Sequence, residues 1–434
     1  MTQTILNFKL EPTNEKLTAR AGVAILGEYL KGMNLEKLCN TNLPKAKRNN
    51  GYSAFEFIFP LILMLHSGGR FLDDIREIMV DKALATLLKI KNIPTANAVS
   101  KYLRKYGTKG EEGIREINKI FLKQYLKKIE TKELILDIDA TFIEAHKNTA
   151  KWSYKNAPGY MPMVGHINGG YVIDVDFREG NEAPAKENLE FIKQCQQQLP
   201  IGVKFDRVRI DSAGYQASIF NYCDKENILF TVTAKKNKNV FESIKEIQDD
   251  EWTDFSKREK IAEFTHVMQD TDNAFRMIVI KKDITPTLPT MEEYISDEVM
   301  MQYQDEIYYC IATNDNDLTP TEIIKLHRQR GETSENKIKE LKNGFNMSYL
   351  PSSNFEANAF YFYIGTLAYN LFLLFKQILD KNLQKHTVKT IRYKLYNIAA
   401  KVVTHARDII LKVNEAFTNL LQKIRYKAYE ESLQ

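Results

Sequence analysis

Residues 134–146 read Leu-Ile-Leu-Asp-Ile-Asp-Ala-Thr-Phe-Ile-Glu-Ala-His. Apolar residues occupy both alternating positions at the start of this stretch, which is typical of a strand buried in the middle of a sheet. Asp137 and Asp139 lie two residues apart, so their side chains point to the same face of that strand. Because an unpaired buried carboxylate is costly, something must compensate these charges. A divalent cation and an arginine or lysine partner are both open at this point.

Length and composition describe a globular chain that is large enough for more than one domain. The 434 residues are 44% hydrophobic and 27% charged. The four cysteines are far apart, with no Cys-x-x-Cys pair, which disfavours a zinc site or a disulfide framework. The N-terminal residues do not read as a signal peptide, and the most apolar run, residues 360–375, is short for a membrane span. We therefore expect a cytoplasmic protein without a membrane partner.

Positive charge is concentrated towards the C-terminus. The net charge of the chain is +5, but residues 376–427 alone carry +9, which leaves −4 for the remainder. Such an asymmetry suggests a polyanionic partner, and nucleic acid is the obvious class. The alternative is an ordinary solvated helix face.

The spacing of apolar residues divides the chain into five parts. Residues 1–130 are predicted to be a helical, DNA-binding region, and residues 131–235 alternate between strands and helices. Residues 236–320 form a β-rich insertion, residues 321–350 a long helix, and residues 351–434 a basic helical region. In the first part, the basic segment 98–106 fits either the second helix of a helix-turn-helix DNA reader or a structural helical bundle.

The second part has the order strand, strand, strand, helix, strand, helix, strand. Asn168-Gly169-Gly170 predicts a hairpin turn between the second and third strands. This order matches an RNase H-like sheet, so the predicted fold class is α/β, an RNase H-like core with an insertion and flanking helical regions. The predicted strands are 133–145, 161–167, 170–177, 207–210, 228–233 and, in the insertion, 261–268, 274–281 and 306–313. The predicted helices are 183–198, 215–226, 322–345, 355–379, 387–405 and 407–429.

Two further acids accompany the first pair. Asp211 ends a predicted strand and is followed by small residues, and open α/β sheets place their ligands at such strand ends. An N-cap role for Asp211 is the alternative. Glu335 lies at the edge of the apolar stripe of the helix 322–345. Together with Asp139, these carboxylates supply the hard oxygen ligands that a pair of magnesium ions needs.

These residues resemble a DDE transposase of a bacterial insertion sequence, in the branch with a β-rich insertion before the catalytic glutamate. The resemblance is carried by residues 136–141, 209–212 and 330–342, and supported by residues 165–167, 177–181 and 355–359. It implies catalysis by Asp139, Asp211 and Glu335, with Asp137 as a further metal ligand. It also implies two Mg²⁺ ions, with Mn²⁺ as an alternative, and DNA partners: the element's terminal inverted repeats and the target. A homodimer is expected, because two element ends must be held together.

The third motif of that family is a Tyr-Arg-Glu-Lys signature. Arg330, Glu335 and Lys342 match its last three members, but His327 stands in the tyrosine position and the gap from Arg330 to Glu335 is one residue longer than usual. A competing register keeps both gaps and uses Arg328, Glu332 and Lys339, with Lys325 in the tyrosine position. We prefer Glu335 because residues 335–342 match as a block.

DNA contacts are predicted around these acids. Basic side chains can bind phosphates, and aromatic side chains can stack on unpaired bases. A packed hairpin tip and structural roles are the alternatives for the residues outside the helix. The predicted DNA-binding residues are Arg330, Lys339, Lys342, His327, Arg178, Trp152 and Lys155. Two rival functions are an RNase H-like nuclease without strand transfer and a catalytically silent DNA-binding protein of the same fold.

Overall fold

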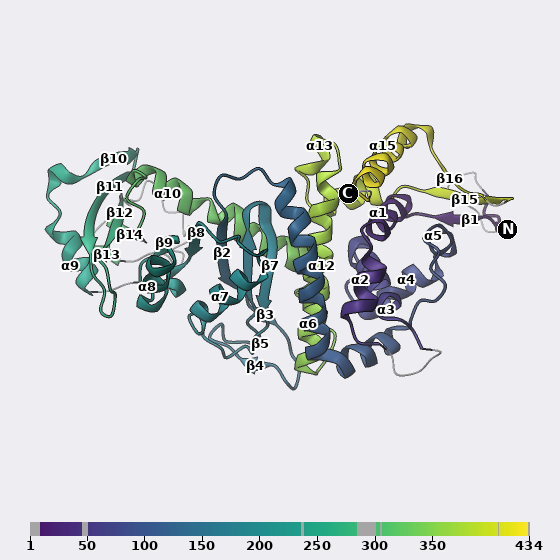
Figure 1. Cartoon of the computed structure of the whole chain (residues 1–434), viewed down its shortest axis with the longest axis horizontal. Helices are drawn as coiled ribbons and strands as arrows, with labels where there is room; N and C mark the ends of the chain where they lie inside the picture. The colour runs from purple at the N-terminus through teal and green to yellow at the C-terminus, as the bar shows by residue number, and fades with distance from the viewer. Residues whose placement is uncertain are drawn as a thin grey trace. The chain divides into compact units, whose positions relative to one another are not determined.

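A computed structural model describes residues 9–45, 51–235, 238–283, 301–303, 306–406 and 408–432 (Figure 1). The chain folds into two compact units. We call residues 1–113, 344–346 and 371–434 the terminal unit, and residues 114–343 and 347–370 the core unit.

The core unit is built on one mixed sheet. Its strand order is β10-β11-β12-β14-β9-β8-β2-β6-β7, with β13 paired to β14. A second, small sheet has the order β3-β5-β4. The strands are β2 (Ile135–Ala140), β3 (Ile143–Glu144), β4 (Lys151–Trp152), β5 (Pro158–Tyr160), β6 (Met163–Ile167), β7 (Tyr171–Asp176), β8 (Arg207–Ile210), β9 (Leu229–Thr233), β10 (Thr253–Ser256), β11 (Glu259–His266), β12 (Phe275–Asp283), β13 (Met301–Tyr303) and β14 (Glu306–Thr313).

The strands β7, β6, β2, β8 and β9 confirm the predicted fold class. β6 pairs antiparallel with both β7 and β2, whereas β2, β8 and β9 run parallel to one another. That is the arrangement of an RNase H-like sheet. The predicted turn joins β6 to β7, with Gly169 and Gly170 at positive φ angles of 78° and 90°. A side chain at Gly169 would meet the Tyr125 hydroxyl, so both space and backbone require glycine there.

The insertion continues the core sheet. β14 pairs antiparallel with β9, placing Ile311 opposite Thr233, so β10 to β14 extend the same sheet. Residues 238–246 add a helix, α9 (Lys238–Glu246). Ile323 and Ile324 of α10 (Pro320–Arg328) pack on apolar residues of β11, β12 and β14, including Ile280. The insertion therefore shares a core with the helix that precedes the predicted catalytic glutamate.

The predicted helix 322–345 has the right place but is not continuous. It consists of α10, a π-helical turn (Gly331–Glu335) and α11 (Asn336–Gly344). The predicted start is confirmed, because the Thr319 hydroxyl accepts a hydrogen bond from the Glu322 backbone N–H. The remaining helices with residues in the core unit are α6 (Ala96–Lys128), α7 (Asn188–Gln198), α8 (Ala217–Glu226) and α12 (Phe355–Gln377), with 3-10 turns at Asn168–Gly170, Ser212–Gly214 and Asp249–Glu251.

Two asparagines fasten β7 to its neighbouring helices. The Asn118 side-chain amide of α6 donates to the Val172 carbonyl, and the Asn370 side-chain carbonyl of α12 accepts from the Val172 N–H. α12 is long and apolar enough to cross a membrane by composition, but its apolar window is wholly buried in the protein. The helices Ala54–Ser67 and Leu72–Val80 pass the same test only if taken as one bent span. The prediction that residues 360–375 form a buried helix is confirmed.

The terminal unit combines helices with a three-stranded sheet of order β1-β15-β16. The predicted basic helix 98–106 is the beginning of the long helix α6. Its Tyr102 is buried and stacks on Phe57, which favours the structural alternative over a separate DNA-reading helix. The elements of this unit are β1 (Lys16–Thr18), α1 (Ala21–Gly32), α2 (Leu35–Asn42), α3 (Ala54–Ser67), a 3-10 turn (Leu72–Asp74), α4 (Ile75–Val80), α5 (Lys82–Leu87), α13 (Lys381–Gln384), α14 (Val388–Ile391), a π turn (Arg392–Tyr396), β15 (Ala400–His405), β16 (Asp408–Val413) and α15 (Glu415–Ser432).

The prediction of two long helices over 387–405 and 407–429 is wrong in part. β15 and β16 form an antiparallel hairpin in the middle of that range. The first predicted helix is helical only over residues 388–396, and α15 accounts for most of the second. β-branched residues explain the difference. Val402, Val403, Ile409 and Ile410 lose side-chain freedom in a helix and fit a pleated strand better.

Candidate active site

The two acids of β2 have different surroundings. Asp137 is buried and forms a two-pronged ion pair with Arg209 of the neighbouring parallel strand β8, with both N–O distances 2.7 Å. The sheet register places these two residues directly opposite each other. The partner is thus an arginine, as one of the two alternatives for this pair proposed.

Asp139 lies near the C-terminal end of β2, where the strand is only half-buried. Its side chain is 18% exposed, and it forms an ion pair with Arg330, whose Nη2 lies 3.3 Å from Oδ2. Burial raises the pKa of Asp139 to about 6; Arg330 counteracts this rise, and the carboxylates of Asp211 and Glu335 add to it. The three predicted catalytic acids therefore lie within electrostatic reach of one another.

Asp211 follows β8 and caps the 3-10 turn Ser212–Gly214. Its Oδ1 accepts a hydrogen bond of 2.9 Å from the Ala213 N–H. The N-cap alternative is therefore present in the structure, and it fixes the orientation of a carboxylate that also repels Asp139. The two roles of Asp211 are compatible, because one oxygen serves as the cap.

Glu335 is the last residue of the π turn. Its side chain is 58% exposed, and its Oε1 lies 3.8 Å from Arg330 Nη1. A π turn accommodates one more residue than an α turn, so the additional residue between Arg330 and Glu335 falls within it. Glu332, the competing candidate, is exposed, whereas Glu335 lines the same cavity as Asp139. The structure thus brings Glu335, rather than Glu332, to Asp139.

Arg330 is buried among the acids. Burial by itself lowers the pKa of Arg330, but Asp139, Asp211, Asp137 and Glu335 together raise it above the ordinary value. Its guanidinium therefore supplies positive charge to this cluster and is only 6% exposed. Within the described residues, no group of three His, Cys, Asp or Glu side chains has the spacing to hold a metal ion.

A cavity of about 290 Å³ opens beside Asp139 and Glu335. Thr141, Lys339 and Lys342 also line it. The Lys342 ammonium donates to the Phe142 carbonyl at 2.7 Å and to the Thr141 hydroxyl at 3.2 Å, so it holds the segment that follows β2. Burial lowers the pKa of Lys342, which Asp139 partly counteracts. Lys339 is exposed on the same helix, α11.

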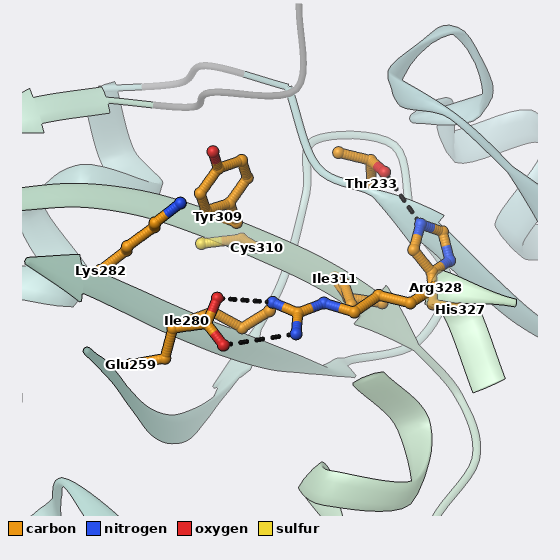
Figure 2. A pocket seen from close by; sticks show the side chains of 9 residues that line it. All are labelled: Thr233, Glu259, Ile280, Lys282, Tyr309, Cys310, Ile311, His327 and Arg328. Atoms are coloured by element: carbon orange, nitrogen blue, oxygen red, sulfur yellow. Dashed lines mark hydrogen bonds and ion pairs between the residues drawn. The ribbon is translucent and has the colours of Figure 1, made fainter. Parts of the chain in front are cut away.

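His327 belongs to a different cavity of about 230 Å³, shown in Figure 2. Its ring nitrogens lie 3.0 Å from the Thr233 hydroxyl and 3.2 Å from the Thr231 hydroxyl. Burial lowers the pKa of His327 to about 3, so the ring is neutral. Arg328, the arginine of the competing register, pairs with Glu259 in the same view. Among the described residues, no hydrogen bond or ion pair joins His327 or Arg328 to Asp139, Asp211 or Glu335.

The other predicted DNA contacts lie elsewhere. Arg178 is buried and donates from Nε to the Met161 carbonyl and from Nη1 to the Lys186 carbonyl, which is a structural arrangement. Trp152 on β4 is 66% exposed. Lys155 lies in the turn after β4, with its ammonium 5.0 Å from the centre of the Tyr154 ring. Trp152 and Lys155 thus present an aromatic and a cation near the surface.

Sequence reasoning missed one group beside the acids, the arginine that pairs with Asp137. Arg209 lies two residues before Asp211, just as Asp137 lies two before Asp139, and this matching spacing on neighbouring strands was the available signal. His166 stands opposite Asp137 on β6 and is completely buried, and neither ring nitrogen has a hydrogen-bond partner among the described residues. Burial lowers the pKa of His166 to about 3, assisted by the charges of Lys337 and Arg330.

The comparison with known families decides the identity. The family described as transposase DDE domain, group 1, matches residues 6–429. The chain belongs to the family of DDE transposases. A solved structure of piggyBac transposase, described as a synaptic complex with hairpin DNA, is similar at 12% identity and a TM-score of 0.44, covering 88% of this chain and 82% of that one. No curated protein matches the chain. A DDE transposase is a DNA-processing enzyme, so the acid cluster lies in a protein of the predicted activity class.

Proposed function

We propose that this transposase belongs to a bacterial insertion sequence, cuts the ends of that element and joins them to target DNA in the cytoplasm. The observation that carries the proposal is the convergence of Asp139, Asp211 and Glu335 around Arg330. These three acids come from the end of β2, the end of β8 and the π turn before α11. Their meeting at one place in the core unit supports the proposal.

The chemistry of these donors suits divalent cations, although the described side chains do not have the spacing of a formed metal site. All three candidates offer carboxylate oxygens, the hard ligands that Mg²⁺ and Mn²⁺ prefer. Burial raises the pKa of Asp139 and the carboxylates of Asp211 and Glu335 add to the rise, so a cation bound there would stabilise its charged form. Asp139, Asp211 and Glu335 would hold two ions. When bound, the ions would activate the attacking water or hydroxyl and stabilise the leaving oxygen.

The surrounding residues orient the acids and the DNA. The Ala213 N–H fixes one oxygen of Asp211, and Arg330 balances the charge between Asp139 and Glu335. Lys342 fixes the position of the segment after Asp139 through the Phe142 carbonyl. Exposed Lys339 is placed to contact a phosphate beside the cavity.

The DNA would be the element's terminal inverted repeats and a target duplex. Trp152 and Lys155 would stack and bind near the unpaired bases of the cut end. A homodimer would hold the two ends of one element together.

A strand-cleavage and joining assay on labelled element-end DNA with Mg²⁺ tests the proposal. We expect Glu335→Gln to lower the cleavage rate by more than about 100-fold. Residues that only orient a metal ligand change activity by about 10–100-fold, and loss of a ligand itself should cost more. Glu332→Gln is the matched control and should retain activity. Full activity of the Glu335 variant would contradict the assignment. Clean cutting without joining would identify a nuclease, and binding without cutting a silent DNA-binding protein.

A further inference from the structure

The C-terminal hairpin of the terminal unit leaves one strand edge open. β15 lies between β1 and β16, so it is paired along both edges, whereas β16 is paired to β15 alone among the described residues. Ile409 and Ile410 of β16 are 39% and 41% exposed. An apolar strand with an open edge is a ready template for another strand, and proteins usually protect such edges.

A hollow of about 670 Å³ runs beside this edge. Residues 408–411 of β16 line it together with Ile25 of α1 and Leu88. Glu28 and Arg425, which form an ion pair, lie in the same wall. The hollow thus offers space next to the open edge, with apolar contacts and a charged border.

The charges of β16 are self-complementary. Its sequence is Asp408-Ile409-Ile410-Leu411-Lys412-Val413. If two copies pair antiparallel about a two-fold axis through Ile410, Asp408 of each lies opposite Lys412 of the other, and Ile409 lies opposite Leu411. A shift of the axis by half a residue step places Asp408 opposite Leu411 or Val413 instead, and a shift by one whole residue places it opposite Ile410 or Asn414. Only the register centred on Ile410 matches both charges.

The single chain leaves Lys412 facing a like charge. Within the hairpin, Lys412 lies opposite Lys401, and Lys401 is paired with Glu15. No ion pair joins Lys412 to an acid in the part of the chain that the structure describes. Like charges directly opposite each other destabilise a sheet. An aspartate arriving at the open edge would compensate Lys412.

We propose that the open edge of β16 is an interface between two copies of this chain, which forms a continuous six-stranded sheet across a two-fold axis. The order of that sheet is β1-β15-β16, followed by β16-β15-β1 of the second copy. Main-chain hydrogen bonds supply affinity, and the reciprocal Asp408–Lys412 contacts specify the register. The interface is independent of the cleavage chemistry, so a protein without strand transfer would form it too.

Charge exchange tests the interface in the full chain by sedimentation equilibrium at micromolar concentration. The unaltered protein is expected to be a dimer. Asp408→Lys and Lys412→Asp each place like charges opposite each other twice, and each should raise the dimer dissociation constant at least about ten-fold. The double variant with both changes should dimerise again, as should an equimolar mixture of the two single variants. Lys260→Asp, the same charge change on exposed β11, should leave the dimer unaltered.

Cross-linking gives a second readout that does not depend on dissociation. Ile410→Cys places two thiols opposite each other on the axis, at a spacing that suits a disulfide. The four native cysteines are buried, so mild oxidation should give a covalent dimer only in this variant. Ile201→Cys, at a fully exposed isoleucine of the core unit, is the matched control and should stay monomeric on a non-reducing gel.

Three results would overturn the proposal. One is an unaltered protein that is monomeric at these concentrations. Another is a double variant that remains dissociated although circular dichroism shows that it is folded. The third is a set of single variants that keep the dimer but lose affinity for DNA, since the hairpin would then bind nucleic acid instead.

Discussion

Asp137 and Asp139 are two residues apart on one strand and face the same side of one sheet, yet they are held in opposite ways. Asp137 is buried in the sheet and accepts two short hydrogen bonds from Arg209. Asp139 has one longer contact to Arg330, partial exposure and two further carboxylates in reach. Removing one partner of a buried ion pair is strongly destabilising, whereas a partly exposed acid whose charge is disfavoured by burial is a candidate for binding a ligand. The comparison separates the structural end of β2 from its reactive end.

The largest effect is expected on stability at the structural end. Asp137→Ala leaves the Arg209 guanidinium buried without its partner, so we expect the free energy of unfolding to fall by about 3–5 kcal/mol. Urea denaturation followed by circular dichroism measures it. Replacing both partners, Asp137→Leu with Arg209→Met, should restore most of the loss. If the alanine variant is as stable as the unaltered protein, the ion pair does not stabilise the sheet.

At the reactive end the effect should fall on chemistry instead. Asp139→Asn removes a charge that burial disfavours, so the protein should remain folded and no less stable without metal. DNA cleavage in Mg²⁺ should drop more than about 100-fold. Asp137→Ala and Asp139→Asn are compared in both measurements, cleavage of the same element-end DNA and urea denaturation. A loss of stability without a loss of cleavage in Asp139→Asn would reverse the comparison.

Two buried histidines extend the comparison to pH. His166 and His327 both have pKa values lowered to about 3, so the unfolded chain binds their protons from about pH 6.5 downwards and the folded chain does not. Their contribution to stability is complete above pH 6.5 and is lost progressively as the pH falls towards 3. Between pH 7 and pH 5, each should contribute on the order of 2 kcal/mol to the pH dependence of unfolding.

His327→Gln offers the cleaner test, because glutamine can keep hydrogen bonds to the two threonines but does not titrate. The difference in unfolding free energy between pH 7 and pH 5 should shrink by about that amount in the variant. An unchanged pH dependence would mean that His327 is protonated in the folded protein.

The smallest effect distinguishes the two lysines of α11. Lys339 is exposed beside the cavity, so Lys339→Gln should weaken DNA binding uniformly across sequences and lower the salt slope of log K by about one. Lys342 is held by the Phe142 carbonyl and Thr141 hydroxyl, and Lys342→Met should mainly disturb cleavage. Fluorescence anisotropy at several salt concentrations measures both. Equal salt slopes for Lys339→Gln and the unaltered protein would remove Lys339 from the DNA interface.

Much of the core could be predicted because its signals are local. β8 and β14 begin and end at the predicted residues, and the turn after β6 follows from two adjacent glycines. The converging acids were predictable for a related reason. Each of Asp139 and Asp211 lies at or just beyond the end of a strand, and parallel neighbours such as β2 and β8 end at the same edge of the sheet.

The parts that could not be predicted depend on pairing between distant residues. The spacing of apolar residues does not show that β14 pairs with β9, or in which register. The same holds for Arg209 as the partner of Asp137. The sequence of the β15 and β16 hairpin predicts helix, because its lysines and apolar residues also suit an amphipathic helix, and only its β-branched residues favour strands. The π turn was visible in advance only as one additional residue before Glu335.

The central claim is that the reactive end of β2 binds the catalytic cation and that its structural end does not. A crystal soaked in Mn²⁺ and measured at an anomalous wavelength tests this directly. We expect a peak bonded to an oxygen of Asp139 and shared with Asp211 or Glu335, while Asp137 remains paired with Arg209. A peak on Asp137, or no peak at Asp139 when one is present elsewhere, would contradict the account.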